Sequence, residues 1–255
     1  MVRCIAGHQT GAVWSPFLYL CFINGLIENL VKLNIGFSIA NNSFCAPTVA
    51  DDMLLLSLSR NSLQIMLNEC YRYSCMWRYQ YNASKCAVVI FDNSKAKAKK
   101  HRKDLNLGTS PLAESYNYKY LGVICDRRSM TSPCVKECCD KIRGTFFRLV
   151  NYGFNNDGLQ PLTCKHIYNA VVVPKALYGS KCWPPLSKKD VLTLERAHRL
   201  CLKYIQGLSA RTSTDIVLGL LNALPTEYEI DKRKLNLFGQ LCRLDIYCAI
   251  NIKYT

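Results

Sequence analysis

The chain has 255 residues, which is enough for one large domain or two small ones. Because 49% of the residues are hydrophobic, the chain can bury a core, and a disordered chain is excluded. Its 33 Lys and Arg residues outnumber 18 Asp and Glu residues, which gives a net charge of +15. Such an excess attracts polyanions, so nucleic acid is the predicted partner. An anionic membrane is the alternative, but we expect no membrane partner because no basic amphipathic helix with an aromatic face stands out.

The 15 cysteines are odd in number and irregular in spacing, which does not fit a disulfide framework. Polar residues 8–11 precede any apolar run, so residues 1–16 do not resemble a secretory leader. We therefore predict an intracellular protein, nuclear or cytoplasmic, that is not secreted. Cys134, Cys138 and Cys139 come closest to a metal cluster, but no histidine is near them in sequence, so a zinc site is not expected.

The first predicted helix follows residues 7–13, a loop of mostly small residues. Ser15 can cap this helix, and Pro16 can be its first residue because the N–H that proline lacks is not needed there. Apolar residues then recur at three- and four-residue spacing, as one face of a helix requires. They are Leu20, Ile23, Ile27, Leu30 and Val31. Loop and helix together would allow a close approach of the backbone to a ligand.

Next in the chain, residues 37–39 are a predicted strand that ends at a turn, residues 41–43. Residues 45–50 and 53–58 are then predicted to form the two arms of a hairpin with Asp51-Asp52 at its tip. Two adjacent carboxylates at a hairpin tip suit a hard divalent cation and suggest metal-assisted phosphoryl transfer. An ordinary surface turn is the alternative, because Asp often hydrogen-bonds its own backbone there.

A second helix is predicted from about Ser62 to Tyr79. Mostly apolar residues form a stripe along one face of this helix, and such a stripe is more typical of a core than of a binding surface. The stripe consists of Leu63, Met66, Leu67, Cys70, Tyr71, Ser74 and Trp77. Residues 82–85 are a predicted loop, and residues 86–91 a buried strand.

The densest charge run of the chain follows, at residues 95–103. It is either a solvated loop between strands or a loop that contacts nucleic-acid phosphates. Its candidate backbone-contacting residues are Lys95, Lys97, Lys99, Lys100, Arg102 and Lys103.

Tyr116, Tyr118 and Tyr120 alternate with polar residues, which predicts a strand; they would either stack on bases or pack against one another. From about Pro133 onward the pattern becomes helical. The predicted helices cover residues 133–150, 159–180, 187–206, 212–221 and 226–247. The sequence thus predicts an α+β half followed by an all-helical half.

The order of several short motifs resembles the reverse transcriptase of non-LTR (LINE-type) retrotransposons. The motifs are Gly7-x-x-x-Gly11-x-x-x-Ser15-Pro16-Phe17, Ile23-Asn24, Ala50-Asp51-Asp52, Trp77…Asn82…Lys85 and Tyr118-x-Tyr120-Leu121-Gly122. The resemblance covers residues 1–125 and continues more loosely through Ala176-Leu177-Tyr178-Gly179 and Leu194-Glu195-Arg196-Ala197-His198. It implies a partial right-handed-polymerase palm, an antiparallel sheet with packed helices, over residues 1–125. A helical thumb-like and post-polymerase region would follow over residues 126–255.

The resemblance also implies roles for single residues. Asp51, with Asp52 beside it, would hold Mg²⁺ or Mn²⁺ together with an Asp from an earlier strand, for two-metal nucleotidyl transfer. Lys85 would donate a proton to the leaving pyrophosphate. The partners would be an RNA template, a DNA primer and deoxynucleoside triphosphates. Residues facing the nucleotide and template would be Gly7, Gln9, Thr10, Gly11, Ser15 and Pro16, and the primer grip would be Tyr118, Tyr120, Leu121 and Gly122.

The chain departs from the family pattern in two ways. Gln9-Thr10 stands where the family usually carries Arg-Gln, which removes a guanidinium that could pair with a phosphate. The sequence also starts a few residues before this loop, so we expect an N-terminally truncated fragment without the earlier acidic strand. Such a fragment is expected not to polymerise DNA alone. The alternative function is that of a non-enzymatic basic module that binds nucleic acid through its phosphates.

Overall fold

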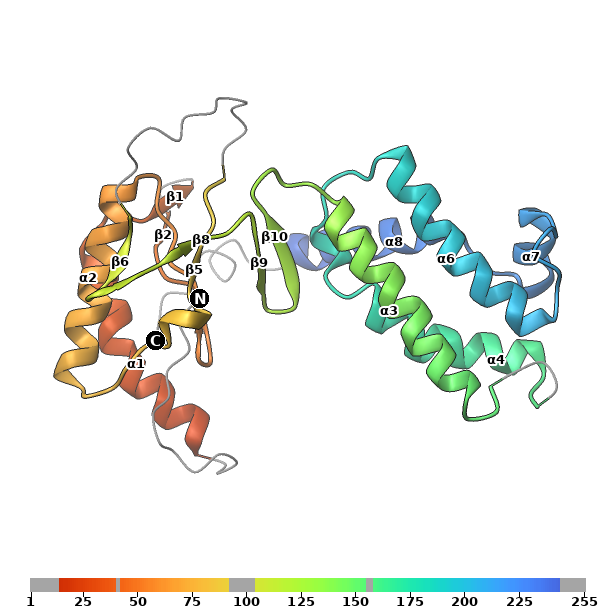
Figure 1. Cartoon of the computed structure of the whole chain (residues 1–255), viewed down its shortest axis with the longest axis horizontal. Helices are drawn as coiled ribbons and strands as arrows, with labels where there is room; N and C mark the ends of the chain where they lie inside the picture. The colour runs from red at the N-terminus through yellow and green to blue at the C-terminus, as the bar shows by residue number, and fades with distance from the viewer. Residues whose placement is uncertain (1–13, 40–41, 92–103, 155–157, 244–255) are drawn as a thin grey trace. The chain divides into compact units, whose positions relative to one another are not determined.

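The structure, a computed structural model, describes residues 14–39, 42–91, 104–154 and 158–243. The chain divides into two compact units, and the division falls between Leu121 and Gly122 (Figure 1). The described residues up to Leu121 are called the N-terminal unit below, and those from Gly122 to Arg243 the helical unit. The mixture of helices and small sheets confirms the α+β class. The assignment of the units to a palm and a thumb remains a prediction.

The N-terminal unit has two long helices and short paired strands. Three of its strand pairs, β1–β2, β3–β4 and β6–β7, are antiparallel, as predicted for the sheet. The pair β5–β8 is parallel, which differs from the predicted antiparallel sheet. Its elements are α1 (Ser15–Lys32), β1 (Phe37–Ile39), β2 (Asn42–Phe44), β3 (Thr48–Val49), β4 (Asp52–Met53), α2 (Arg60–Met76), the 3-10 turn η1 (Ala83–Lys85), β5 (Ala87–Val88), β6 (Asn106–Leu107), β7 (Ser110–Pro111), β8 (Ala113–Glu114) and β9 (Asn117–Tyr120).

Two predictions about turns and strands were wrong in this unit. Part of the turn predicted at residues 41–43 is strand, because β2 begins at Asn42 and pairs with β1. The strand predicted at residues 86–91 is reduced to β5, since its neighbour β8 provides only two residues for pairing.

The N-terminal core is formed by α1, α2 and buried residues of the short strands and loops. The Tyr73 hydroxyl donates a hydrogen bond of 2.7 Å to the Phe22 carbonyl of α1. The Phe22 ring meets the ring of Trp77 edge-on, with centroids 5.3 Å apart. Of the predicted apolar stripe, Tyr71 and Trp77 are 43% and 52% exposed, so their assignment to the core was wrong. Tyr73, which the stripe omits, is buried in their place.

The helical unit follows the predicted helices closely, with one interruption. The helix predicted at 159–180 is broken into α4, a π-helical turn and α5, and the chain turns at Gly179 with φ +76°. The helix predicted at 226–247 is described as far as Arg243. The elements are β10 (Val123–Asp126), α3 (Ser132–Val150), α4 (Pro161–Ile167), the π turn η2 (Tyr168–Val172), α5 (Val173–Ala176), the 3-10 turn η3 (Ser180–Cys182), α6 (Lys188–Gln206), α7 (Thr214–Leu221) and α8 (Thr226–Arg243).

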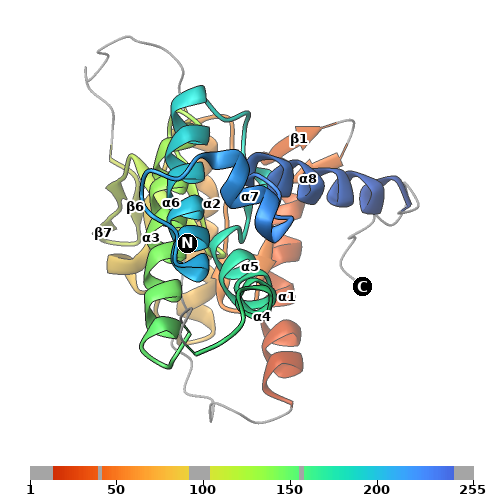
Figure 2. The same ribbon diagram turned by 90° about the vertical axis from the view of Figure 1, so that its right-hand side faces the viewer.

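The core of the helical unit is centred on α3 and α6, which lie side by side in Figures 1 and 2. Cys134, Cys138 and Cys139 are buried in this core, where they pack as small apolar residues. Burial raises the pKa of Cys138 and of Cys201 to about 12, so both are neutral thiols at physiological pH.

Polar side chains join the helix ends of this unit. The Asp190 carboxylate of α6 accepts hydrogen bonds of 3.0 Å from both Thr131 and Ser132 at the start of α3. One oxygen of Glu195 accepts from the backbone N–H and the hydroxyl of Thr226, at 2.9 and 2.6 Å, and so caps the start of α8. These contacts give the 194–198 motif a structural role within the unit.

Among the described residues, no helix is both long and apolar enough to span a bilayer.

Candidate active site

The acidic pair lies at the end of the β3–β4 hairpin, shifted by one residue from the prediction: Asp51 is in the turn, and Asp52 is the first residue of β4. Val49 of β3 pairs with Asp52 of β4, so Ala50 and Asp51 form a two-residue turn. Ala50 has a φ of +49°, a left-handed conformation that non-glycine residues adopt mainly where the surrounding structure requires it. Further backbone hydrogen bonds, from Leu54 N to Pro47 O (2.9 Å) and from Leu56 N to Cys45 O (2.8 Å), extend the two arms.

A pocket of about 480 Å³ opens beside this hairpin tip. Asp51 and Asp52 are half-buried there, whereas Lys85 is exposed. The structure therefore brings the acidic pair, the predicted proton donor and one predicted primer-grip tyrosine into one pocket. The lining residues are Asp51, Asp52, Ser84, Lys85, Cys86, Ala87 and Tyr118. No motif in the sequence points to Ser84, Cys86 or Ala87 as site residues.

Lys85 is positioned by a capped turn. It ends η1, whose first residues are held by Asn82: the Asn82 side-chain oxygen accepts from Ser84 N (3.1 Å) and from Ser84 Oγ (2.6 Å). The Tyr118 hydroxyl donates a hydrogen bond of 3.0 Å to the Lys85 carbonyl. Asn82 and Tyr118 therefore fix the backbone that carries the Lys85 ammonium.

Tyr118 is neutral in this pocket. Burial raises the pKa of its phenol, and electrostatic interactions with Asp52 and then Cys86 raise that pKa further. The hydroxyl therefore remains a hydrogen-bond donor at physiological pH, as its contact with the Lys85 carbonyl requires.

The other predicted primer-grip residues form the end of β9 and a sharp turn. The Tyr120 hydroxyl lies 3.5 Å from the Pro47 carbonyl on the acidic hairpin. Leu121 and Gly122 both have left-handed backbones, with φ of +47° and +79°. At Gly122 a Cβ atom would stand 3.0 Å from the ring of Tyr178, so glycine suits both the turn and this close approach.

The predicted nucleotide-facing residues divide into two groups. Ser15 and Pro16 form the first turn of α1, whose N-cap is Trp14, so the prediction of Ser15 as the cap was wrong. The nucleotide-facing residues Gly7, Gln9, Thr10 and Gly11 lie outside the described residues, and so does the basic run of residues 95–103. Their roles remain predictions.

The donor atoms in the pocket suit a hard divalent cation, because Asp51 and Asp52 offer carboxylate oxygens. Within the described part of the chain, no group of three or more His, Cys, Asp or Glu side chains is arranged to hold a metal ion. The acidic pair would thus supply part of a coordination shell. Carboxylates beside an exposed ammonium suit the chemistry of phosphoryl transfer.

No protein-family model matches the chain. It is similar to the RNA-directed DNA polymerase from mobile element jockey of Drosophila funebris, with 31% identity over 128 residues, which are 48% of this chain. It is also similar to the jockey polymerase of Drosophila melanogaster, with 24% identity over 209 residues, which are 79% of this chain. These relatives confirm the resemblance to LINE-type reverse transcriptases. The matched parts are 13% and 22% of the two relatives' own lengths.

Proposed function

We propose that this chain forms the acidic-hairpin part of an RNA-directed DNA polymerase of the LINE type. The observation that carries the proposal is the shared pocket of Asp51, Asp52, Lys85 and Tyr118, in a chain similar to jockey polymerases. The partners would be an RNA template, a DNA primer and deoxynucleoside triphosphates.

Each side chain of the pocket has a distinct role in this proposal. Asp51 and Asp52 would hold Mg²⁺ or Mn²⁺, which when bound supplies activation of the primer hydroxyl and neutralisation of phosphate charge. The exposed ammonium of Lys85 can reach a phosphate in the pocket and donate a proton to it. Tyr118 keeps the turn that carries Lys85 beside the acidic pair through its hydrogen bond to the Lys85 carbonyl.

In this proposal a further carboxylate, from outside the described residues, completes the site. Mg²⁺ prefers a nearly octahedral shell and binds weakly to one or two carboxylates unless substrate phosphates help. We therefore propose that the 255-residue chain does not extend a primer by itself.

Primer extension tests the proposal. The purified chain, with Mg²⁺ or Mn²⁺, an RNA template and a DNA primer, is expected to give no product. Fusion of the preceding part of the Drosophila funebris jockey polymerase to its N-terminus is expected to give product. In this fusion Asp51→Ala should reduce extension about a hundredfold or more, because the metal loses a ligand that acts in the transition state.

The matched control is Asp104→Ala, since Asp104 is an exposed carboxylate of the same unit that does not line the pocket. It should leave extension unchanged. Product from the unfused chain that Asp51→Ala abolishes would refute the need for an outside carboxylate. A folded fusion that extends no primer, or whose extension survives Asp51→Ala, would refute the polymerase proposal.

A second candidate function, a non-enzymatic nucleic-acid-binding module, is favoured by exposed cations on the two central helices of the helical unit. They are Lys136, Arg143 and Arg148 of α3 and Lys188, Lys189 and Arg196 of α6. Contacts of this kind release counterions and make binding steeply dependent on salt.

For this second function, the logarithm of affinity should fall with the logarithm of salt concentration. The expected slope is about −0.9 for each neutralised phosphate on duplex DNA and about −0.7 on single strands. Fluorescence anisotropy with labelled oligonucleotides between low and physiological salt measures it. Asp51→Ala should leave this binding unchanged, and a flat salt profile would exclude the module.

A further inference from the structure

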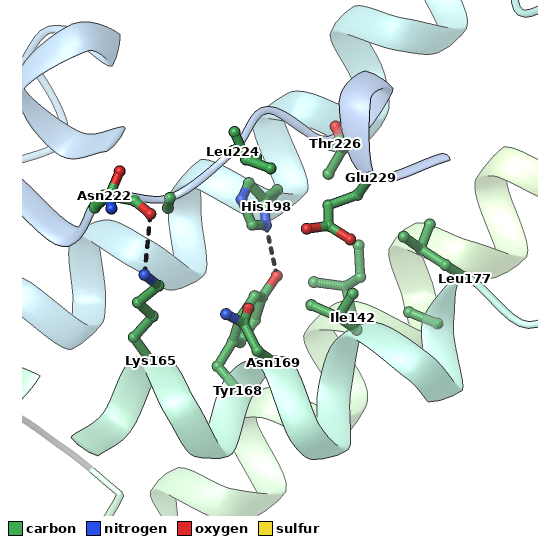
Figure 3. A pocket seen from close by; sticks show the side chains of 13 residues that line it. Ile142, Lys165, Tyr168, Asn169, Leu177, His198, Asn222, Leu224, Thr226 and Glu229 are labelled. Carbon is green, nitrogen blue, oxygen red and sulfur yellow. Dashed lines mark hydrogen bonds between the residues drawn. The ribbon is translucent and has the colours of Figure 1, made fainter. Parts of the chain in front are cut away.

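The helical unit uses its buried polar groups for its own packing. A cavity of about 210 Å³ lies between α4, η2, α6 and the start of α8. Beside it, the Tyr168 hydroxyl lies 2.8 Å from Nδ1 of His198, and Lys165 donates a 3.0 Å bond to the Asn222 carbonyl (Figure 3). These bonds join elements of one unit and stabilise its fold. The outer side of α3 and α6 is different, because it combines cations with aromatic rings.

The two central helices run parallel to each other along their whole length (Figures 1 and 2). Near the start of α6, the Asp190 carboxylate accepts a 3.0 Å bond from Thr131, which precedes α3. Near the ends of both helices, the rings of Phe147 and Tyr204 meet with centroids 6.0 Å apart. The starts therefore lie together, and so do the ends.

Exposed residues mark the edge of each helix that lies next to the other helix. They recur at steps of seven and four residues, which keep side chains on one side of a helix. Arg143 belongs to this edge: burial raises the pKa of Cys201 in α6 to about 12, and the nearby charge of Arg143 acts against that rise. We call the following residues the α3–α6 face: Lys136, Arg143 and Phe147 of α3, and Lys189, Arg196, Leu200 and Tyr204 of α6.

Positive charge dominates the α3–α6 face because the carboxylates of the two helices are used elsewhere. In α3 and α6, which the structure describes in full, Asp140 is the one exposed carboxylate among four. Asp190 and Glu195 accept hydrogen bonds within the unit, and Glu137 pairs with Lys141 at 3.1 Å. The four cations of the face therefore outweigh one carboxylate, and the face attracts a polyanion.

Two aromatic rings lie at one end of this face. Phe147 and Tyr204 are 41% and 40% exposed. Each also meets the buried ring of Phe146, with centroids 5.4 and 5.6 Å apart, so both rings are held in place from the side of the core. A fixed ring with exposed surface is a platform for an unpaired base. Because every base has an aromatic face, such stacking depends little on sequence.

This combination favours a single strand over a duplex or a membrane. In a duplex the bases stack on one another and present only their edges to a protein, so the two rings would gain no stacking partner. A membrane surface requires a broad apolar side beside the cations. The large apolar side chains of the face are two rings and Leu200.

We propose that the α3–α6 face binds single-stranded nucleic acid, with phosphates on its four cations and bases against its two rings. The inference deepens the second candidate function, on which it rests, because it names one ligand class and selects four of the six exposed cations. Arg148 is not among the four. It follows Arg143 by five residues, which places it about 140° away around the axis of α3.

The first arm of the test separates bases from phosphates by fluorescence anisotropy. The full 255-residue chain is titrated with an oligothymidine of about 12 nucleotides, a length within the site sizes of single-strand-binding folds. The same backbone without bases and a duplex of equal length are the other two ligands. Tyr204→Leu should weaken binding of oligothymidine at least about fivefold, because stacking is lost, and should leave the other two affinities unchanged.

The matched control is Tyr228→Leu, because Tyr228 is an exposed tyrosine of α8 in the same unit. It should leave all three affinities unchanged. Circular dichroism checks that the variants fold. Tyr204→Trp keeps an aromatic face at this position, so it should retain the affinity for oligothymidine, and the new indole should be quenched by oligothymidine but not by the abasic strand.

The second arm tests the choice of cations. Arg143→Gln should reduce the salt slope of oligothymidine binding by about 0.7, the contribution of one phosphate on a single strand. Arg148→Gln, an exposed arginine of the same helix, should leave the slope unchanged.

Three results would overturn the inference alone: unchanged oligothymidine binding in Tyr204→Leu, no quenching in Tyr204→Trp, or equal slopes in Arg143→Gln and Arg148→Gln. A chain that binds none of the three ligands would refute the second candidate function together with the inference. Neither arm requires polymerisation, so both are independent of primer extension.

Discussion

Replacing Phe146 with alanine is expected to destabilise the helical unit by about 4 kcal/mol, within the range measured for buried aromatic residues. Phe146 is fully buried on α3, and its ring meets four other rings edge-on, with centroids 5.4–6.2 Å away. Alanine would remove these contacts and leave a cavity where α3 packs against α6. The contacting rings are those of Phe147, Phe154, Tyr168 and Tyr204.

Denaturant unfolding measures this loss. Trp183 is buried in the helical unit, so with Trp14 and Trp77 replaced by phenylalanine its fluorescence reports on this unit. The control is Phe238→Ala, because Phe238 is 65% exposed on α8 and should change the free energy of unfolding by less than about 0.5 kcal/mol. Similar losses for both variants would show that Phe146 is not the centre of the core.

The long helices were predictable because one periodic pattern determines each of them. Pro16 and Pro133 stand in the first turns of α1 and α3, and Ser187 caps α6. The interruption at residues 168–172 was not predictable, because the apolar pattern continues through it. The first residue of the π turn, Tyr168, contacts His198, which lies 30 positions later, and no local pattern indicates this contact.

The strands were harder to predict than the helices. Several of them have only two residues, so pairing with a neighbour decides which residues count as strand. The β5–β8 pair joins residues 87–88 to residues 113–114, and no local signal in either segment identifies a parallel partner. Tertiary contacts therefore outweigh local propensity in this part of the fold.

The acidic hairpin was predictable from local sequence, since strand-forming residues flank two carboxylates. The rest of the candidate site was not. Lys85 and Tyr118 are 33 residues apart, and the contact of the Tyr118 hydroxyl with the Lys85 carbonyl appears only in the folded chain. The resemblance assigned them separate roles, whereas the structure places both in the pocket of Asp51 and Asp52.

The second large effect is expected at Asp190, where Asp190→Asn should destabilise the helical unit by about 2–3 kcal/mol at pH 7. The buried carboxylate accepts from the hydroxyls of Thr131 and Ser132 at 3.0 Å and from that of Ser187 at 2.7 Å. An amide has one acceptor oxygen and no charge, so it cannot satisfy all three donors equally well. Denaturant unfolding, followed by Trp183 fluorescence in the chain with Trp14 and Trp77 replaced by phenylalanine, measures this loss of stability.

The loss should also depend on pH, with a definite sign. Burial acts to raise the pKa of Asp190, but hydrogen bonds from Ser187, Thr131 and Ser132 outweigh it and lower the pKa. A carboxylate with a lowered pKa contributes its full stability above the unfolded-state value of about 3.9, and that contribution is lost as the pH falls through the folded-state pKa. The difference between the parent and Asp190→Asn should therefore be constant near neutral pH and shrink below about pH 4.

Asp140→Asn is the matched control, because Asp140 is exposed on α3. It should change the free energy of unfolding by less than about 0.5 kcal/mol. An Asp190→Asn loss that persists unchanged at acidic pH would mean that the carboxylate charge is not what joins the starts of α3 and α6. The hydroxyls of Thr131 and Ser132 would then hold the junction through side-chain shape alone.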